Sequence, residues 1–362
     1  MQMPTIGQGT GSKGVNEKTF EADFHSLVSS VQAGIDLGLN LIDTAEIYAD
    51  GRSETIVGAA IKSSRSSVLI ATKFSPDHHR PEQVSNSAKN SLRRLGTDVI
   101  DIYQIHWPNP SVPLEETIYA MTDLQEKGFI KEIGVCNFNY KQLLDAVSIA
   151  DKLGTRIYAN QIKFNLVDQF AYQNIKNFCN INQVKVIAYS PFKSILNGSE
   201  TRKLALSKIA KEYEATEMQV ALAWIISQKN VIPVPESSNI NHIKEISETR
   251  NLKLTEGSKI ELENVFSNLV IDLPVHKVRS RNSQRGSVLV GKKEEIEKIS
   301  NQFVPSIIEL ATEISTGEFL QPILVRKSLS GDDIFEIIEG ELRFWAYVYV
   351  NGETSTIPAI IN

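Results

Sequence analysis

Several short apolar runs in this sequence end on polar side chains of types that can transfer protons. The run Leu39–Ile42 ends on Asp43, with Tyr48 five residues further on, and two later runs end on Lys73 and His106. An acid at the tip of a buried strand must be paired or reach a cavity, because an isolated buried charge is expensive. Taken alone, Asp43 is equally consistent with a helix N-cap, and Tyr48 with a half-buried aromatic. Brought together, the four groups would form an acid–base site.

The elements that must position these residues alternate along the chain. Helical patterns end before Gly96 and Gly128, and a buried helix is predicted to start at Thr216. Eight strand–helix units in about 250 residues predict an α/β fold, a closed (β/α)₈ TIM barrel. The expected strands are Thr5–Gln8, Leu39–Asp43, Val68–Lys73, Val99–His106, Ile133–Cys136, Ile157–Gln161, Val184–Tyr189 and Val231–Val234.

A barrel of this kind carries its chemistry at the carboxyl ends of its strands. The polar residues that close the expected strands are Asp43, Lys73, His106, Asn137, Gln161 and the pair Tyr189-Ser190. Their convergence on one mouth favours a functional interpretation of Asp43 over a cap. The rival fold, an open doubly wound sheet, needs a GxGxxG turn after its first strand. The segment Gly7–Gly11 has the wrong glycine spacing for that turn.

The composition is that of an ordinary globular protein. Of the 362 residues, 41% are hydrophobic and 22% charged, and the net charge of −5 gives no general reason to expect nucleic-acid binding. The two cysteines, Cys136 and Cys179, are too few for a disulfide framework. No apolar stretch has the length of a membrane span and no signal peptide is recognisable, so a cytoplasmic location is expected.

The polar residues at the strand ends belong to longer motifs that resemble those of the aldo-keto reductase family. The motifs follow the family's order from about Gly7 to Leu254, within an expected barrel domain of residues 1–266. One departure lies inside them, because Cys136 replaces the family's serine before the asparagine. The matching segments are Asp43-Thr44-Ala45 with Tyr48, Gly51-Arg52-Ser53-Glu54 with Gly58, Thr72-Lys73, His106-Trp107-Pro108, Gly134-Val135-Cys136-Asn137-Phe138 and Tyr189-Ser190-Pro191.

The resemblance implies a reversible conversion between a carbonyl (aldehyde, ketone or sugar) and an alcohol, with NADP or NAD and without a metal. Tyr48 would supply the proton, and Lys73 would lower the pKa of this phenol. Asp43 would pair with Lys73, and His106 would hydrogen-bond the substrate carbonyl. The alternatives are a surface lysine for Lys73 and a satisfied core histidine for His106.

The resemblance also assigns residues to the cofactor. Asn137 and Gln161 match positions that bind the nicotinamide carboxamide, Tyr189 matches the aromatic that stacks on its ring, and Cys136 offers a weak donor. Glu236 stands where the family often has a phosphate-compatible residue; it either favours NAD, as an acid at the ribose does, or faces solvent. Both NAD and NADP therefore stay open. The other expected contacts are Ser190, Pro191, Ser237, His242 and Glu245.

Residues 267–362 are expected to form a second, small α+β domain. Three of its segments, Leu320–Arg326, Gly340–Ala346 and Ile357–Ile360, resemble the ParB N-terminal/sulfiredoxin-like fold. That resemblance implies that the Gly-Glu-x-Arg segment, which starts at Gly340, is a loop that binds a nucleotide phosphate. The alternative is that Glu341 and Arg343 form a structural salt bridge. Strands are expected at 322–325, 334–338 and 357–360, and strand-like residues within 269–278. Helical residues are expected within 294–314, broken at Pro305, and 346–350 is expected to continue a helix that ends at Asn351-Gly352.

Differences from proteins of that fold argue against two of their activities in the second domain. It contains no cysteine, so sulfiredoxin chemistry has no nucleophile, and its acidic residues outnumber the basic ones, so DNA binding is not expected. A basic run would either hold a phosphate or form a solvated loop: Lys277, Arg279, Arg281 and Arg285.

Three functions remain open from the sequence. The leading hypothesis is an oxidoreductase with an appended regulatory or nucleotide-binding domain, which the four residues Asp43, Tyr48, Lys73 and His106 favour. The second is a redox-sensing protein that holds the cofactor without turnover. The third is a nucleotide-dependent, kinase-like activity in the C-terminal domain. The sequence does not identify the substrate.

Overall fold

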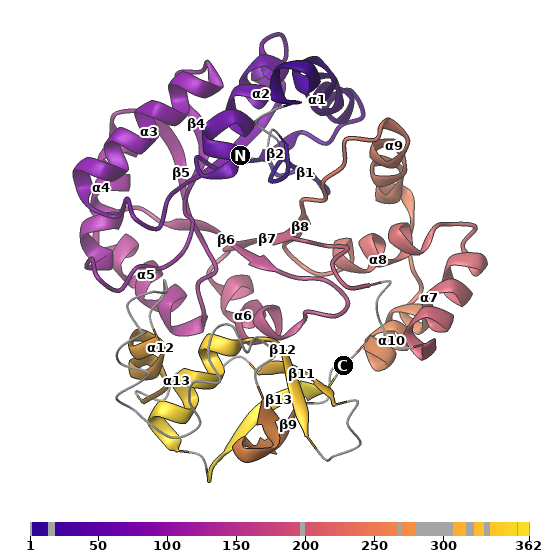
Figure 1. The fold of residues 1–362 in the computed structure, drawn as a ribbon. Helices are drawn as coiled ribbons and strands as arrows, with labels where there is room; N and C mark the ends of the chain where they lie inside the picture. The colour runs from indigo at the N-terminus through magenta and orange to yellow at the C-terminus, as the bar shows by residue number, and fades with distance from the viewer. Residues whose placement is uncertain are drawn as a thin grey trace. The chain divides into compact units, whose positions relative to one another are not determined.

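The computed structural model describes residues 2–13, 19–195, 200–266, 270–279, 307–315, 322–328, 334–352 and 354–361. The chain divides into two compact units, Met1–Phe266 and Ser267–Asn362. Figure 1 shows both units, with the C-terminal one in orange to yellow.

The first unit is a barrel of eight parallel strands in sequential order, as predicted (Figure 1). Two backbone hydrogen bonds join its first and last strands, from Gly7 N to Pro233 O (2.9 Å) and from Gly9 N to Pro235 O (2.8 Å). A Cβ on Gly9 would lie 2.9 Å from Val234 O, so this closure requires glycine. The strands are β1 (Gln8–Gly9), β2 (Leu41–Asp43), β3 (Leu69–Phe74), β4 (Ile100–Ile105), β5 (Ile130–Cys136), β6 (Ile157–Lys163), β7 (Lys185–Tyr189) and β8 (Val231–Pro233).

Helices surround the strands on the outside of the barrel (Figure 1). Gly96 follows one of them in the left-handed conformation, with φ 62°, and Thr216 caps another by accepting from Gln219 N, both as the sequence indicates. The α-helices are α1 (Phe20–Asp36), α2 (Arg52–Ile61), α3 (Pro81–Leu95), α4 (Leu114–Glu126), α5 (Tyr140–Lys152), α6 (Phe170–Ile181), α7 (Glu200–Glu212), α8 (Glu217–Ile226), α9 (Ile240–Glu248) and α10 (Glu256–Phe266). Short 3₁₀ turns are η2 (Tyr48–Gly51), η3 (Arg65–Ser67) and η4 (Thr249–Asn251).

Alternation along the strands decides which side chains enter the barrel. Residues such as Ile42 and Ile70 belong to the large core between strands and helices, whereas Leu41, Ala71 and Ile187 belong to a separate inner cluster. Successive strand residues point to opposite faces, so the residue two positions further on shares a face. That rule turns inward Asp43, Lys73, Gln161 and Tyr189.

The described residues of the second unit form a mixed five-stranded sheet in the order β10-β12-β11-β13-β9, which packs with α12 and α13 around its own core. Its elements are β9 (Val270–Pro274), η5 (Val275–Lys277), β10 (Val278–Arg279), α12 (Ile307–Ser315), β11 (Ile323–Lys327), β12 (Phe335–Glu339), α13 (Glu341–Asn351) and β13 (Thr356–Ile361). In neither unit does a helix of the described residues combine the length and apolarity needed to cross a membrane.

The structure refines the bounds of two expected segments in the second unit. The predicted strand at 269–278 is two strands, because η5 turns the chain directly after Pro274. The predicted helix at 346–350 is the later part of α13, which starts at Glu341 and ends before Gly352. Helix α12 begins after the predicted break at Pro305; the earlier part of the predicted helix, with Arg281 and Arg285 of the basic run, lies outside the described residues.

Candidate active site

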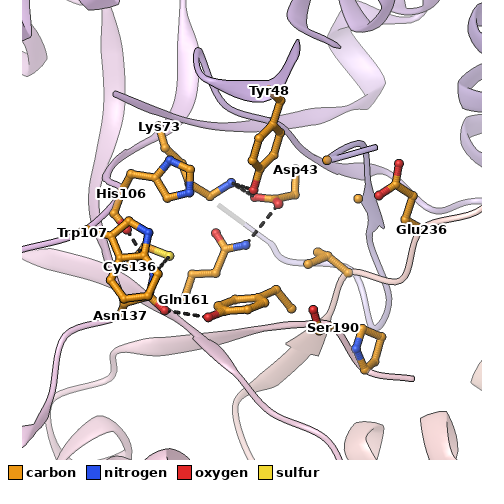
Figure 2. A pocket seen from close by; sticks show the side chains of 15 residues that line it. Asp43, Tyr48, Lys73, His106, Trp107, Cys136, Asn137, Gln161, Ser190 and Glu236 are labelled. Atoms are coloured by element: carbon orange, nitrogen blue, oxygen red, sulfur yellow. Dashed lines mark hydrogen bonds and ion pairs between the residues drawn. The ribbon is translucent and has the colours of Figure 1, made fainter. Parts of the chain in front are cut away.

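The carboxyl ends of the barrel strands surround a pocket of about 280 Å³ (Figure 2). Three of the expected cofactor residues, Ser237, His242 and Glu245, do not line it; they lie in the loop after β8 and on α9. The expected residues that do line it are Asp43, Tyr48, Lys73, His106, Cys136, Asn137, Gln161, Tyr189, Ser190, Pro191 and Glu236.

Four further lining residues were not assigned from the sequence: Gly9, Gly11, Trp107 and Val234. Trp107 is 42% exposed and belongs to the motif that contains His106, which was the signal available for it. Gly9 ends β1 and Gly11 follows it; in the sequence their segment resembled only a GxGxxG turn with the wrong spacing.

Lys73 and Asp43 form a buried ion pair in the pocket, with Nζ 2.8 Å from Oδ1. The neighbouring strands β2 and β3 supply them, and their side chains are only 5% (Asp43) and 1% (Lys73) exposed. Lys73 Nζ also donates to Thr44 O at 2.7 Å and to the Tyr48 hydroxyl at 3.5 Å, which uses all three ammonium hydrogens. Burial acts to lower the pKa of Lys73, but the charge of Asp43 and the other neighbours raise it above its ordinary value. Lys73 is therefore charged.

Tyr48 begins the turn η2, in which the next three residues have positive φ angles of 51°, 54° and 82°. Lys73 acts to lower the pKa of Tyr48, as expected, but the net shift of this pKa is upward. Burial raises this pKa to about 12; Lys73 lowers it and the charge of Asp43 raises it, so the neighbours do not overcome the loss of solvent. Tyr48 is therefore protonated near neutral pH.

His106 follows β4, and its ring meets that of Tyr48 edge to face with centroids 5.7 Å apart. Burial lowers the pKa of His106 to about 3, and the charge of Lys73 adds to this effect, so the imidazole is neutral. Its Nδ1 is buried and has no hydrogen-bond partner among the described residues. A neutral imidazole carries one hydrogen. We place that hydrogen on Nε2, since Nδ1 has no acceptor to receive it.

An amide network holds the second oxygen of Asp43. Gln161 Nε2 donates to Asp43 Oδ2 at 3.1 Å, and Gln104 Nε2 donates to Gln161 Oε1 at 2.9 Å. Gln104 faces Gly134 on β5, where a Cβ would lie only 2.8 Å from Gln104 Cγ. The glycine therefore makes room for Gln104, a residue that the sequence alone did not single out.

A hydrogen bond joins Tyr189 to Asn137, which lies across the pocket from Glu236 (Figure 2). The Tyr189 hydroxyl donates to Asn137 Oδ1 at 2.8 Å, and Asn137 Nδ2 donates to His106 O at 3.1 Å and contacts Cys136 Sγ at 3.2 Å. Burial raises the pKa of Cys136 to about 12, so the thiol stays protonated. Asn137 and Ser190 have φ angles of 63° and 53°, strained conformations of the kind that cluster at functional sites.

The motif that contains Glu54 supports β3 from outside the barrel. Glu54 is fully buried, and its two oxygens accept from Thr72 Oγ1 and from Arg94 Nε, both at 2.6 Å. Thr72 directly precedes Lys73, so its hydrogen bond to Glu54 holds the end of the strand that carries the lysine.

Glu236 does not simply face solvent. Its carboxylate accepts from Ser12 N at 3.0 Å and from Ser12 Oγ at 2.7 Å, which joins the loop after β8 to the loop after β1. The Ser237 carbonyl accepts from Lys13 Nζ at 3.0 Å. Lys13, a further residue that carried no sequence signal, is 1% exposed.

In the second unit, Gly340 has φ 99° and precedes α13, and Arg343 Nη1 donates to Pro322 O at 2.9 Å. Lys277 and Arg279 lie at η5 and β10. Across the described residues of both units, no cluster of three or more His, Cys, Asp or Glu side chains could hold a metal ion.

Comparison with known proteins agrees with this arrangement. The aldo/keto reductase family profile matches residues 5–264, and the ParB N-terminal domain profile matches residues 289–362. Methylglyoxal reductase YeaE of Escherichia coli K12 is 31% identical, with 74% of this chain and 92% of the relative covered.

Two solved structures show the same barrel. The thermostable aldo-keto reductase Tm1743, in complex with epalrestat, is 35% identical, with a TM-score of 0.69 over 73% of this chain and 96% of that one. An aldo/keto reductase from Klebsiella pneumoniae with NADP and acetate is 29% identical, with a TM-score of 0.65 over 73% and 92%. The chain that folds into this barrel thus belongs to the aldo/keto reductase family of NAD(P)H-dependent oxidoreductases.

Proposed function

We propose that the pocket reduces the carbonyl of a small aldehyde, ketone or sugar, with Tyr48 as the proton donor. The observation that carries this proposal is the continuous chain from Asp43 through Lys73 to Tyr48, at 2.8 and 3.5 Å, beside the neutral ring of His106. Burying an ion pair seldom stabilises a fold. The position of the Asp43–Lys73 pair next to the protonated phenol of Tyr48 favours a catalytic role for the pair over a structural one.

The residues present fit a nicotinamide ring. Tyr189 offers an aromatic face in the pocket, and a carboxamide needs one donor and one acceptor. Asn137 Oδ1 accepts one hydrogen bond and has a second lone pair, while Gln161 Nε2 donates one and has a second hydrogen. Bound there, the dihydronicotinamide would supply a hydride to the carbonyl carbon.

The chain's own groups would then handle the oxygen. The hydrogen on His106 Nε2 would orient the carbonyl and stabilise the developing negative charge. Tyr48 would give its hydroxyl proton to that oxygen, which as an alkoxide is a stronger base than a phenolate. The phenolate left behind would stay 3.5 Å from Lys73 Nζ, whose charge stabilises it. Water would return the proton to Tyr48.

Turnover of a carbonyl panel tests this function. The full chain would be mixed with NADPH or NADH and with methylglyoxal, pyridoxal, an aromatic aldehyde or an aldose, and cofactor absorbance would be followed. We expect carbonyl-dependent oxidation of the cofactor, with Trp107 at the exposed rim favouring substrates that have an apolar or aromatic part. The proposal would be refuted if, at saturating cofactor, the wild-type chain reduced every carbonyl of the panel no faster than the Tyr48→Phe variant.

For the second unit we propose a regulatory, nucleotide-binding role. Gly340 lies directly before α13 with φ 99°, and a glycine-containing loop at a helix N-terminus can bind phosphate; this is the feature that supports the proposal. Against it, Arg343 already donates to Pro322 O. Calorimetric titration of the full chain with ATP and ADP tests the role. Heat that is lost in Gly340→Ala would support it, whereas no binding at millimolar nucleotide would refute it.

A further inference from the structure

Gln104 is a fully buried glutamine on the inner face of β4. In the register of β3 and β4 it stands opposite Lys73, and Ile102, two positions earlier on the same face, belongs to the inner cluster of the barrel. Gln104 Oε1 has no hydrogen-bond partner among the described residues. Burying an amide oxygen without a donor is unfavourable, and an apolar side chain would avoid the penalty. The glutamine is therefore best explained by what its Nε2 does.

The direction of the amide network follows from its acidic end. The Asp43 carboxylate, which is paired with Lys73, only accepts hydrogen bonds, so Gln161 must present Nε2 to Asp43 Oδ2, at 3.1 Å. Gln161 Oε1 then faces Gln104, which must present its own Nε2, at 2.9 Å. Gln104 thus holds the buried amide of Gln161 in the orientation that donates to Asp43.

This orientation determines how Asp43 uses its two oxygens. Oδ2 is occupied by Gln161, while Oδ1 lies 2.8 Å from Lys73 Nζ. The other two hydrogens of Lys73 go to Thr44 O at 2.7 Å and to the Tyr48 hydroxyl at 3.5 Å. Without Gln161, Oδ2 would turn to Lys73 and attract a second hydrogen. The contact with Tyr48 is the longest of the three, so it is the one that would be lost.

We propose that Gln104 is a positioning residue for the proton transfer from Tyr48, because it keeps one hydrogen of Lys73 directed at the phenol. The inference rests on the proposed reductase function. Gln104 does not line the pocket, so it acts through the amide of Gln161 and the carboxylate of Asp43. The ammonium hydrogen stabilises the phenolate that forms at Tyr48, so its withdrawal should slow the chemical step.

A double-mutant cycle on the chemical step tests the proposal. The full chain, saturated with reduced cofactor, is mixed with the carbonyl that the wild type reduces fastest, and stopped flow follows cofactor oxidation in the first turnover. Gln104→Met keeps the side-chain length and removes the donor, so this rate should fall about tenfold. Gln161→Met should lower it at least as much. Adding Gln104→Met to Gln161→Met should change the rate by less than about twofold, because the first residue acts through the second.

Two further variants separate positioning from loss of stability. Gln8→Met is the matched control, because Gln8 is 6% exposed and its Nε2 donates only to backbone carbonyls, Val31 O and Leu39 O. It should leave the first-turnover rate of the folded protein unchanged. Gly134→Ala displaces Gln104 without removing its amide, since a Cβ there would lie 2.8 Å from Gln104 Cγ. It should slow the first turnover, but not when Gln161→Met is already present.

The outcomes distinguish this proposal from the reductase function. A Gln104→Met rate within about twofold of the wild type, or losses that add in the double variant, overturn the proposal while the reductase function stands. An equal fall in Gln8→Met also overturns it. If the wild type oxidises no cofactor with any carbonyl, the proposed function falls and this inference with it. Should Gln104→Met fail to fold, Gly134→Ala, alone and combined with Gln161→Met, decides by the same criteria.

Discussion

The two units use their charged side chains in different ways. In the barrel, Lys73 and Asp43 are removed from solvent and face a pocket. In the second unit, Arg326 and Glu336 pair across two strands while 38% and 27% exposed, and Arg343 donates to a backbone carbonyl. An exposed pair adds about 0–1 kcal/mol, and a buried pair is often no better than apolar packing. The Lys73–Asp43 pair is therefore best explained by chemistry, and the pairing of Arg326 and Arg343 by structure.

The units also differ in how their motifs converge. The barrel pocket collects residues from loops and strand ends that are far apart in sequence, such as Asp43, Lys73 and Gln161. In the second unit the Gly340–Arg343 segment is local, and its arginine reaches back to Pro322. The comparison predicts that substitutions in the barrel pocket reduce catalysis, whereas substitutions at the charged residues of the second unit change only stability.

The largest effect is expected for Tyr48→Phe. It removes the proton donor and leaves the ring, so the rate of carbonyl reduction should fall about 10²–10⁴-fold, while the dissociation constant for the cofactor stays the same. Steady-state kinetics and fluorescence titration measure the two quantities. Tyr119→Phe, at a tyrosine that is 62% exposed on α4, is the control. Retention of most activity in Tyr48→Phe would show that another group supplies the proton.

Lys73→Met should damage both activity and stability. It leaves Asp43 buried without its cation, which costs about 3–5 kcal/mol in the free energy of unfolding. Urea denaturation measures this loss, and Arg326→Ala in the second unit should cost about 1 kcal/mol or less. Adding Asp43→Leu to Lys73→Met should recover stability but not reduction. Equal losses in Lys73→Met and Arg326→Ala would break the comparison between the units.

Acid should destabilise the barrel through its buried histidines. Burial lowers the pKa of His79 from 6.5 to about 4, so between these values the unfolded chain binds more protons than the folded one. The free energy of unfolding should therefore fall as pH drops from about 6.5 towards 4, and His79→Gln should make this fall shallower. Denaturation at several pH values measures the slope, with the exposed His25→Gln as control. An unchanged slope in His79→Gln would contradict the assignment.

The smallest effect is expected from deleting residues 267–362. We propose that the two units fold separately, because each has its own hydrophobic core. A chain of residues 1–266 should fold and bind the cofactor with an unchanged dissociation constant, as circular dichroism and titration would show. Loss of cofactor binding would mean that the second unit contributes to the site.

The sequence by itself determined the barrel and most of its pocket. Short apolar runs separated by helical patterns predicted eight strands, and Gly96 and Thr216 predicted helix ends. These features are local, because strand length, alternation and capping depend on neighbouring residues. The positions of Asp43, Lys73 and Gln161 at strand ends predicted their convergence on one mouth of the barrel.

Only the tertiary structure decided what these residues meet. Ser12 and Glu236 are 224 positions apart, and their contact exists because the first and last strands close the barrel. Gln104 became part of the Asp43 network because Gly134 leaves room beside it. Desolvation, which no local pattern encodes, outweighs the expected lowering of the Tyr48 pKa by Lys73, since it depends on how many distant segments exclude water from one hydroxyl.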